Sequence, residues 1–232
     1  MTTPRTILVL ATTNKGKVRE IRSVLKTLPL KIIGLSELGI DARSPETGET
    51  FEENALEKSL FYSRKSGLLT LAEDSGLEIE ALDGAPGIYS ARFSGRGATD
   101  EKNIRKVLRL MESVPAGRRA ARFVCAMALT RNGELIKTVT GRVSGKITEA
   151  ERGRHGFGYD PIFFYPPLGR TFGELPGREK NRVSHRGRAL DGMRAFLART
   201  LKRPASKEGP APRKGRAKGG GRTLSGHHRA KA

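Results

Sequence analysis

The segment ARFVCAMALTRNGELIKTVTGRV (Ala121–Val143) has the pattern of two antiparallel strands joined by a tight turn. Two runs of apolar and β-branched residues flank the pair Asn132-Gly133. Asn-Gly is the strongest short-range hairpin signal, because both residues tolerate the positive φ angles of a type I′ turn. The segment therefore predicts an antiparallel hairpin within the sheet.

The sequence before this hairpin predicts strand–helix units. Apolar residues at helical spacing favour a helix between Val18 and Leu28. A second helix is expected from Thr50, which forms a capping box with Glu53, to Gly67, a typical C-terminal cap. Short apolar runs predict strands at Thr6–Ala11, Lys31–Gly34 and Leu68–Ala72.

Two more helices are predicted, one on each side of the hairpin. The first starts at Thr99 or Asp100, and the last starts near Ser184 and carries apolar residues to Leu201. Because strand–helix units are mixed with a hairpin, we expect an α/β protein with a mixed central sheet flanked by helices. No linker divides residues 1–201, so any two lobes must share the sheet.

Composition limits the class of protein. A chain of 232 residues suits one large domain or two lobes with a shared core. Its single cysteine, Cys125, lies in an apolar run, so an intrachain disulfide is excluded and a buried core residue is expected. No run approaches the ~18 apolar residues of a membrane span. A soluble protein of the cytoplasm is therefore expected.

The formal charge of +20 is unevenly distributed. Residues 202–232 hold ten lysines and arginines against one acid, which leaves +11 for residues 1–201. This tail is rich in Gly, Pro and Ala and cannot bury enough apolar surface to fold, so we predict that it is disordered. It suits non-specific contacts with nucleic acid through phosphates, or it is a solvated extension.

Two segments carry candidate chemistry near the predicted parallel strands. The loop TTNKGK (residues 12–17) lies between a strand and a helix, where free N–H groups favour an anion, although a solvated turn is an alternative. In LAEDSGL, strand alternation predicts that Glu73 and Asp74 point to opposite faces at the strand's C-terminal end. Such an acid suits a ligand crevice, or it caps a turn. Glu46 is an acid in a loop that the neighbouring helix start does not explain.

Two further segments suit recognition of a base or an anion. In HGFGYDP (155–161), glycines flank Phe157 and leave its ring available for stacking, with a buried aromatic as the alternative. In REKNRVSHRG (178–187), basic residues surround the start of the last helix. Scattered surface charge is the alternative there.

Taken in order, five segments resemble the inosine triphosphate pyrophosphatase family. They are LATTNKGKVREI, ETGETFEENALEK, LAEDSGLEIEALDGAPGIYSARFSG, GFGYDPIFF and EKNRVSHRGRAL. The resemblance covers about residues 7–201. It implies an elongated sheet in two lobes with an active-site cleft between them, a homodimer, and Mg²⁺-dependent hydrolysis of ITP, dITP and XTP to the monophosphate and pyrophosphate.

The resemblance also implies residue roles. Asp74 would accept a proton from the attacking water and, with Glu46, hold the metal. The triphosphate would meet Thr12, Thr13, Asn14, Lys15, Gly16 and Lys17, and Ser75 would contact substrate. The base and sugar would meet Phe157, Gly158, Tyr159, Asp160, Lys180, His185 and Arg186.

Two rival functions remain open. Septum-formation-inhibitor pyrophosphatases act on pyrimidine or modified nucleotides but lack the segments SHRG and GFGYDP present here. The other rival is a nucleic-acid-binding protein that acts through the basic tail. An assay with a panel of nucleotides would distinguish the first rival from a purine nucleotide pyrophosphatase. Deletion of the tail would test the second rival.

Overall fold

A seven-stranded mixed sheet forms the centre of the computed structural model, which describes residues 6–202. The tail predicted to be disordered, residues 202–232, lies outside these residues except for Lys202, which ends the last helix. The strand order is β2-β1-β3-β4-β5-β6-β7, with β1 parallel to β2 and β3 and every later pair antiparallel. The strands are β1 (Thr6–Leu10), β2 (Leu30–Gly34), β3 (Leu69–Ile79), β4 (Ala120–Arg131), β5 (Glu134–Ile147), β6 (Phe163–Tyr165) and β7 (Arg170–Thr171).

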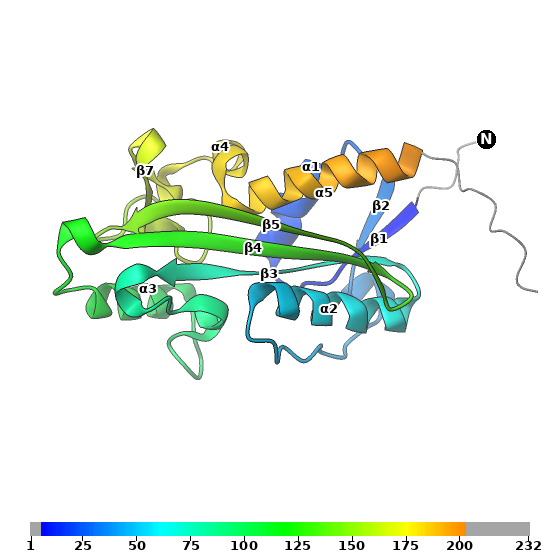
Figure 1. The fold of residues 1–232 in the computed structure, drawn as a ribbon, viewed down its shortest axis with the longest axis horizontal. Helices are drawn as coiled ribbons and strands as arrows, with labels where there is room; N and C mark the ends of the chain where they lie inside the picture. Colours follow the sequence, from blue (N-terminus) through cyan, green and yellow to red (C-terminus); the bar gives the residue numbers. More distant parts are fainter. Residues whose placement is uncertain (1–5, 203–232) are drawn as a thin grey trace, which may run out of the picture. The chain divides into compact units, whose positions relative to one another are not determined.

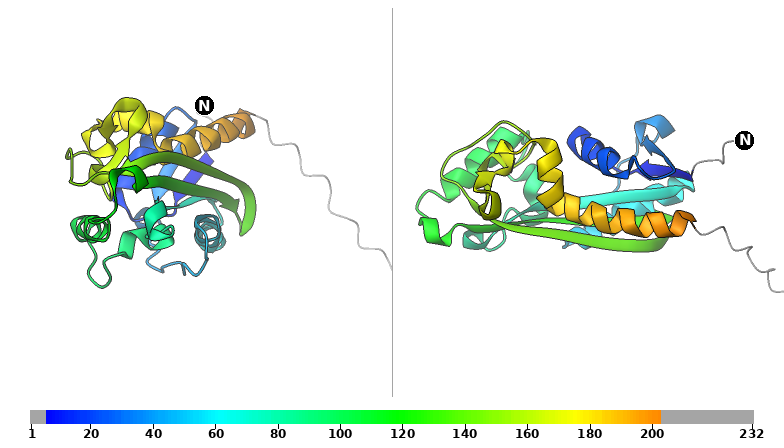
Figure 2. Two further views of the ribbon diagram at one scale, coloured as in Figure 1. Left: turned by 60° about the vertical axis from the view of Figure 1, so that its left-hand side comes forward. Right: turned by 90° about the horizontal axis from the view of Figure 1, so that it is seen from above.

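Helices cover both faces of this sheet (Figure 1). They are α1 (Lys15–Leu25), α2 (Phe51–Ser66), α3 (Asp100–Leu110), α4 (Gly177–Val183) and α5 (His185–Lys202). On one face, α1 and α5 share an apolar cluster with Leu71 and Met127, and Figure 2 shows α5 lying along β5. On the other face, α2 packs on Val124 and Ala126. Within residues 6–202, no helix has the length and apolar character needed to cross a membrane.

Local signals predicted much of this fold correctly. The hairpin turn has φ of 52° at Asn132 and 79° at Gly133, as its sequence requires. The helix α2 begins with the expected capping box between Thr50 and Glu53 and ends at Gly67. The mixed sheet flanked by helices is confirmed, whereas the division into two lobes stays a prediction.

The predicted end of β3 was wrong. The strand continues beyond Ala72 to Ile79, because residues 70–79 pair with β4. A long-range antiparallel partner thus overrides the turn signal of Ser75-Gly76. The prediction also missed α4 and the short strands β6 and β7, which have too few residues to show a periodic pattern.

Gly76 permits the close approach of three segments. A Cβ atom here would clash with the Ser90 hydroxyl, the Gly87 carbonyl and the Phe51 ring. We expect Gly76→Ala to lower the free energy of unfolding by about 1–3 kcal/mol in urea denaturation. Gly117→Ala is the matched control, since its Cβ would meet nothing within 4 Å. Equal stability of the two variants would contradict this account of Gly76.

Candidate active site

The loop between β1 and α1 presents the positive end of a helix. The side chain of Asn14 caps α1 by accepting from the Lys17 N–H at 3.0 Å. The first turn of α1 carries no acid, whereas the first turns of α2 and α3 carry two each. The dipole of α1 is therefore left to attract an external anion. All the predicted triphosphate-binding residues, Thr12, Thr13, Asn14, Lys15, Gly16 and Lys17, lie in this loop and first turn.

The two neighbouring acids lie in the middle of β3, where its parallel neighbour ends. Pairing between β1 and β3 stops at Leu10 and Leu71, followed by one hydrogen bond from Ala11 N–H to the Leu71 carbonyl at 2.9 Å. Beyond Leu71, the edge of β3 that had faced β1 has no strand beside it among the described residues, and we call this stretch the open edge of β3. Glu73 and Asp74 were predicted at the end of a strand and lie instead at this open edge, but on opposite faces as expected.

Glu73 is buried on the face that carries α1 and α5. Its carboxylate accepts from Arg186 Nε at 2.7 Å and lies 2.7 Å from Lys17 Nζ. The Cys125 thiol, whose pKa burial raises, donates to it at 3.1 Å. Burial alone would raise the pKa of Glu73, but Arg186 and Lys17 outweigh it and hold that pKa well below its usual range. Glu73 is therefore a fixed anion that orients two cations.

A chain of ion pairs extends from Glu73 to the last helices. Glu20 on α1 lies 2.8 Å from Arg186 Nη1 and 2.9 Å from Lys180 Nζ. Lys180 also lies 2.6 Å from the Asp160 carboxylate. Three acids thus balance Lys17, Lys180 and Arg186. These three cations are held in fixed positions before any ligand arrives.

A cavity of about 100 Å³ lies against this chain of ion pairs. The Phe157 ring forms part of its wall and lies 4.7 Å from Lys180 Nζ and 5.3 Å from the Arg186 guanidinium carbon. His185 stacks on Phe123 with the ring centres 4.6 Å apart. An aromatic wall backed by cations suits a planar, electron-rich base. Nine predicted substrate residues besides Phe157 line the cavity: Asn14, Lys17, Ser75, Gly158, Tyr159, Asp160, Lys180, His185 and Arg186.

His185 also lines the cavity and is buried in its neutral form. Its Nδ1 has no hydrogen-bond partner within residues 6–202. Burial, reinforced by the charges of Arg186 and Lys180, lowers the pKa of His185 well below its usual range. A neutral imidazole with a free nitrogen can donate to, or accept from, a polar atom of a ligand.

This pKa shift predicts an acid-dependent loss of stability. Below about pH 6.5 the unfolded chain protonates His185 whereas the folded chain does not, so the free energy of unfolding falls by about 1.4 kcal/mol per pH unit for this group. Above that pH the group makes no such contribution. We expect His185→Gln to show a smaller slope in urea denaturation between pH 7 and pH 5. An unchanged slope would contradict the burial of neutral His185.

Asp74 faces the opposite side of the sheet, together with Glu46. Lys58 Nζ on α2 lies 2.6 Å from Glu46 and 3.9 Å from Asp74. Arg92 lies 3.6 Å from Glu46. Burial raises the pKa of Asp74, and the charges of Glu46 and Glu73 add to this effect although Lys58 and Lys17 oppose it. For Glu46, Lys58 and Arg92 outweigh burial and lower the pKa.

This pair of acids fits a hard divalent cation. Its donors are carboxylate oxygens, and they already converge on one positive charge, that of Lys58. No group of three or more metal-binding side chains is found between residues 6 and 202. Mg²⁺ needs no such cage, because it commonly binds through one or two carboxylates together with substrate phosphates and water.

Two of the predicted substrate residues, Tyr159 and Asp160, form hydrogen bonds to neighbouring backbone groups. The Tyr159 hydroxyl donates to the Ser90 carbonyl at 2.8 Å, and Asp160 accepts from the Phe157 N–H at 2.9 Å. Glu20, Arg92 and Asp100 were not predicted from the sequence. Glu20 follows Lys17 by three residues and so shares its helix face, a signal that could have been used. Arg92 and Asp100 gave no local signal, since their partners are distant in sequence.

Comparison with known proteins identifies close relatives. The model of the Ham1 family matches residues 8–196. A dITP/XTP pyrophosphatase of Geobacter sulfurreducens is 50% identical over 192 residues, covering 83% of this chain and 96% of that protein. One of Shigella flexneri is 48% identical over 185 residues, covering 79% of this chain and 93% of that protein. A HAM1 protein structure from Coxiella burnetii superposes with a TM-score of 0.77 at 41% identity, covering 84% of this chain and 99% of that one.

Proposed function

The chain belongs to the Ham1 family, and from this premise we propose that it hydrolyses inosine and xanthosine triphosphates to the monophosphate and pyrophosphate. It is a hydrolase that acts on an acid anhydride. One observation supports our assignment of this activity to the site around β3. The open edge of β3 brings together the uncompensated N-terminus of α1, the Asp74–Glu46 pair and the aromatic cavity.

The substrate's parts match these three features. Free N–H groups of α1 and the exposed Lys15 would meet the phosphates. Lys17 was expected to offset phosphate charge as well, but its charge is already balanced by Glu73 at 2.7 Å. We therefore assign Lys17 mainly to holding the loop and Glu73 together.

We propose Mg²⁺ as the cofactor, held by Glu46 and Asp74. When bound, it would supply positive charge to the phosphate oxygens and so stabilise the charge that develops as pyrophosphate leaves. Lys58 now lies between the two acids, so metal binding requires it to turn away. The released ammonium group would remain close enough to pair with a phosphate.

The chemical step needs one base and no covalent nucleophile. A water oxygen attacks the α-phosphorus, and the bond from that phosphorus to the oxygen bridging to the β-phosphorus breaks. Pyrophosphate leaves with the electrons of that bond, and Asp74 takes the proton of the water. Asp74 suits this role by its position, because it lies at the open edge of β3 beside Glu46 and would be close to a water bound at the metal.

Base recognition involves fewer free donors than the sequence suggested. Lys180 and Arg186 were expected to meet the base and sugar, but they already pair with Asp160, Glu20 and Glu73. Neutral His185, which lines the cavity and has no acidic partner there among the described residues, is the better candidate for a direct hydrogen bond. If His185 is held in the tautomer that donates, such a hydrogen bond would discriminate an oxo from an amino group by roughly 10⁴-fold.

A pyrophosphate-release assay across ITP, dITP, XTP, GTP, ATP and CTP tests this function. We expect activity with the first three and little with the others, and loss of activity when Mg²⁺ is removed by a chelator. Preference for CTP would favour the rival pyrimidine or modified-nucleotide pyrophosphatase. Absence of any triphosphate hydrolysis would favour the nucleic-acid-binding alternative.

Three further features belong to this proposal. We propose a homodimer, which light scattering on the purified protein would measure. We also propose action in the cytoplasm, on the nucleotide pool. The basic tail is proposed to contact nucleic acid non-specifically, and deleting residues 202–232 is expected to remove that binding without changing hydrolysis.

A further inference from the structure

Asp100 makes a long-range contact that the proposed chemistry does not explain. It is the first residue of α3, and its Oδ2 accepts from the Gly158 N–H at 2.7 Å. Asp100 also lines the cavity beside Phe157. The contact joins residues 58 positions apart. An aspartate at a helix start normally serves the helix dipole, so a second partner on another segment needs its own explanation.

Asp100 contacts the loop of residues 153–158, and contacts with other elements help to fix the conformation of this loop. Gly153, Gly156 and Gly158 all have positive φ, so the loop is built from residues with little conformational preference. Its large apolar side chain, Phe157, presses against Gly16 at the start of α1, where a Cβ would lie 2.7 Å from the ring. Phe157 is thus the wall between the cavity and the phosphate-facing loop.

Two carboxylates hold the two N–H groups on either side of the Phe157 side chain. Asp160 accepts from the N–H of Phe157 itself at 2.9 Å, within the same loop. Asp100 accepts from the next N–H, that of Gly158, and so ties the loop to α3, whereas Asp160 ties it to α4 through Lys180 Nζ at 2.6 Å.

The first turn of α3 is itself fixed in place. Asn103 accepts from the Ser94 N–H at 2.8 Å and donates to the Ser90 carbonyl at 3.3 Å. Ser90 also accepts from the Tyr159 hydroxyl at 2.8 Å. Asn103 at the start of α3 and Tyr159 of the cavity loop thus both bond to the Ser90 carbonyl. The helix start that carries Asp100 is therefore fixed to the same segment as the cavity loop.

We infer that Asp100 is a positioning residue for base recognition. It acts through the Gly158 N–H to hold the Phe157 ring in the wall of the base cavity. The inference rests on the proposed function for the identity of the base. Its geometric part, the fixing of the loop, does not depend on that function.

Amide hydrogen exchange of the ligand-free protein tests the geometric part. The amide of Phe157 is the reporter, because it bonds to Asp160 and not to Asp100. We expect Asp100→Ala to speed the exchange of the Phe157 amide by about tenfold. This is the low end of the effect of losing a hydrogen bond to a charged group, because Asp100 is exposed. Glu101→Ala is the matched control: it removes the other first-turn acid of α3 and leaves the loop contact intact. Equal exchange in Asp100→Ala and wild type would overturn the inference.

Calorimetric binding of two probes tests the consequence for recognition. Asp100→Ala is expected to weaken inosine monophosphate about tenfold and to leave pyrophosphate within about twofold. Asp100→Asn keeps an oxygen acceptor and is expected to recover most of this affinity. Equal losses for both probes, equal losses in Glu101→Ala, or no recovery in Asp100→Asn would each overturn the role. If wild type binds neither probe, the proposed function fails while the Phe157 exchange still decides the loop contact.

Discussion

The Asp74→Asn variant is expected to hydrolyse dITP about 10²–10⁴-fold more slowly than wild type, because it lacks the group that takes the proton of the attacking water. Its affinity for nucleotide is expected to stay near that of wild type, since the helix N-terminus and the aromatic cavity are unchanged. Steady-state pyrophosphate release measures the first quantity. Calorimetry with ITP in the absence of Mg²⁺ measures the second.

The fold of this variant is expected to be at least as stable as wild type at pH 7. The pKa of Asp74 is raised in the folded chain, so its ionisation disfavours folding as pH rises from the unfolded pKa through the folded one. Asparagine removes that unfavourable contribution. A loss of turnover therefore cannot be attributed to unfolding.

Glu78→Gln is the matched control for Asp74→Asn. Glu78 lies on the same strand and, four residues on, on the same face, but its carboxylate pairs with the exposed Arg122 of β4. Its turnover is expected to match wild type. Near-normal turnover in Asp74→Asn, or an equal loss in Glu78→Gln, would contradict the role of Asp74.

The Arg186→Met variant is expected to lose about 3–5 kcal/mol of unfolding free energy. Arg186 is buried and bonds to Glu73, Glu20 and the Ser75 hydroxyl, the last at 2.9 Å. Methionine fills a similar volume but leaves two carboxylates short of a partner. Urea denaturation at pH 7 measures the loss.

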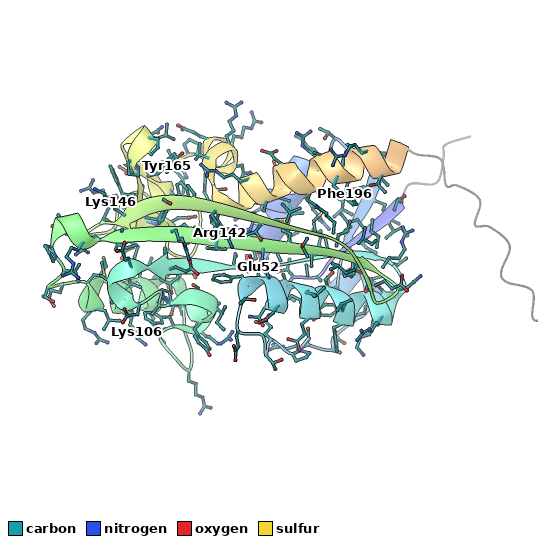
Figure 3. The ribbon with its side chains drawn as sticks, in the orientation of Figure 1. Glu52, Lys106, Arg142, Lys146, Tyr165 and Phe196 are labelled. Carbon is teal, nitrogen blue, oxygen red and sulfur yellow. The ribbon has the colours of Figure 1, made fainter. Side chains whose placement is uncertain are left out.

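Arg142→Met is the control for this substitution. Arg142 pairs with Glu52 at 3.1 Å, but both side chains are exposed, and Figure 3 labels the pair beside α2 and β5. Exposed ion pairs contribute roughly 0–1 kcal/mol, so this variant is expected to unfold close to wild type. Similar losses in the two variants would mean that the buried chain of ion pairs does not organise the site.

Local sequence signals predicted the elements whose causes are local. The Asn132-Gly133 turn, the capping box at Thr50 and the C-terminal Gly67 each depend on a few adjacent residues. The end of β3 depends on β4, more than forty positions later, so the residues around Asp74 could not by themselves show that the strand continues to Ile79. Short elements such as α4 contain too few periodic residues to be predicted.

In the candidate site too, local features could be predicted from the sequence and long-range contacts could not. Strand alternation was enough to separate Glu73 from Asp74, because the direction of side chains in a strand is a local property. That Glu20 would join Lys180 and Arg186 could not be predicted, since it requires knowing that α1 lies beside α4 and α5. The same holds for Asp100 and Gly158, which a loop-by-loop interpretation treats separately.

The position of water attack tests the central claim most directly. Wild-type protein is given dITP and Mg²⁺ in ¹⁸O-labelled water under single-turnover conditions, and the products are analysed by mass spectrometry. Attack at the α-phosphorus by a water that Asp74 activates predicts one ¹⁸O atom in deoxyinosine monophosphate and none in pyrophosphate. Label in pyrophosphate, or in free phosphate released beside the diphosphate, would contradict it.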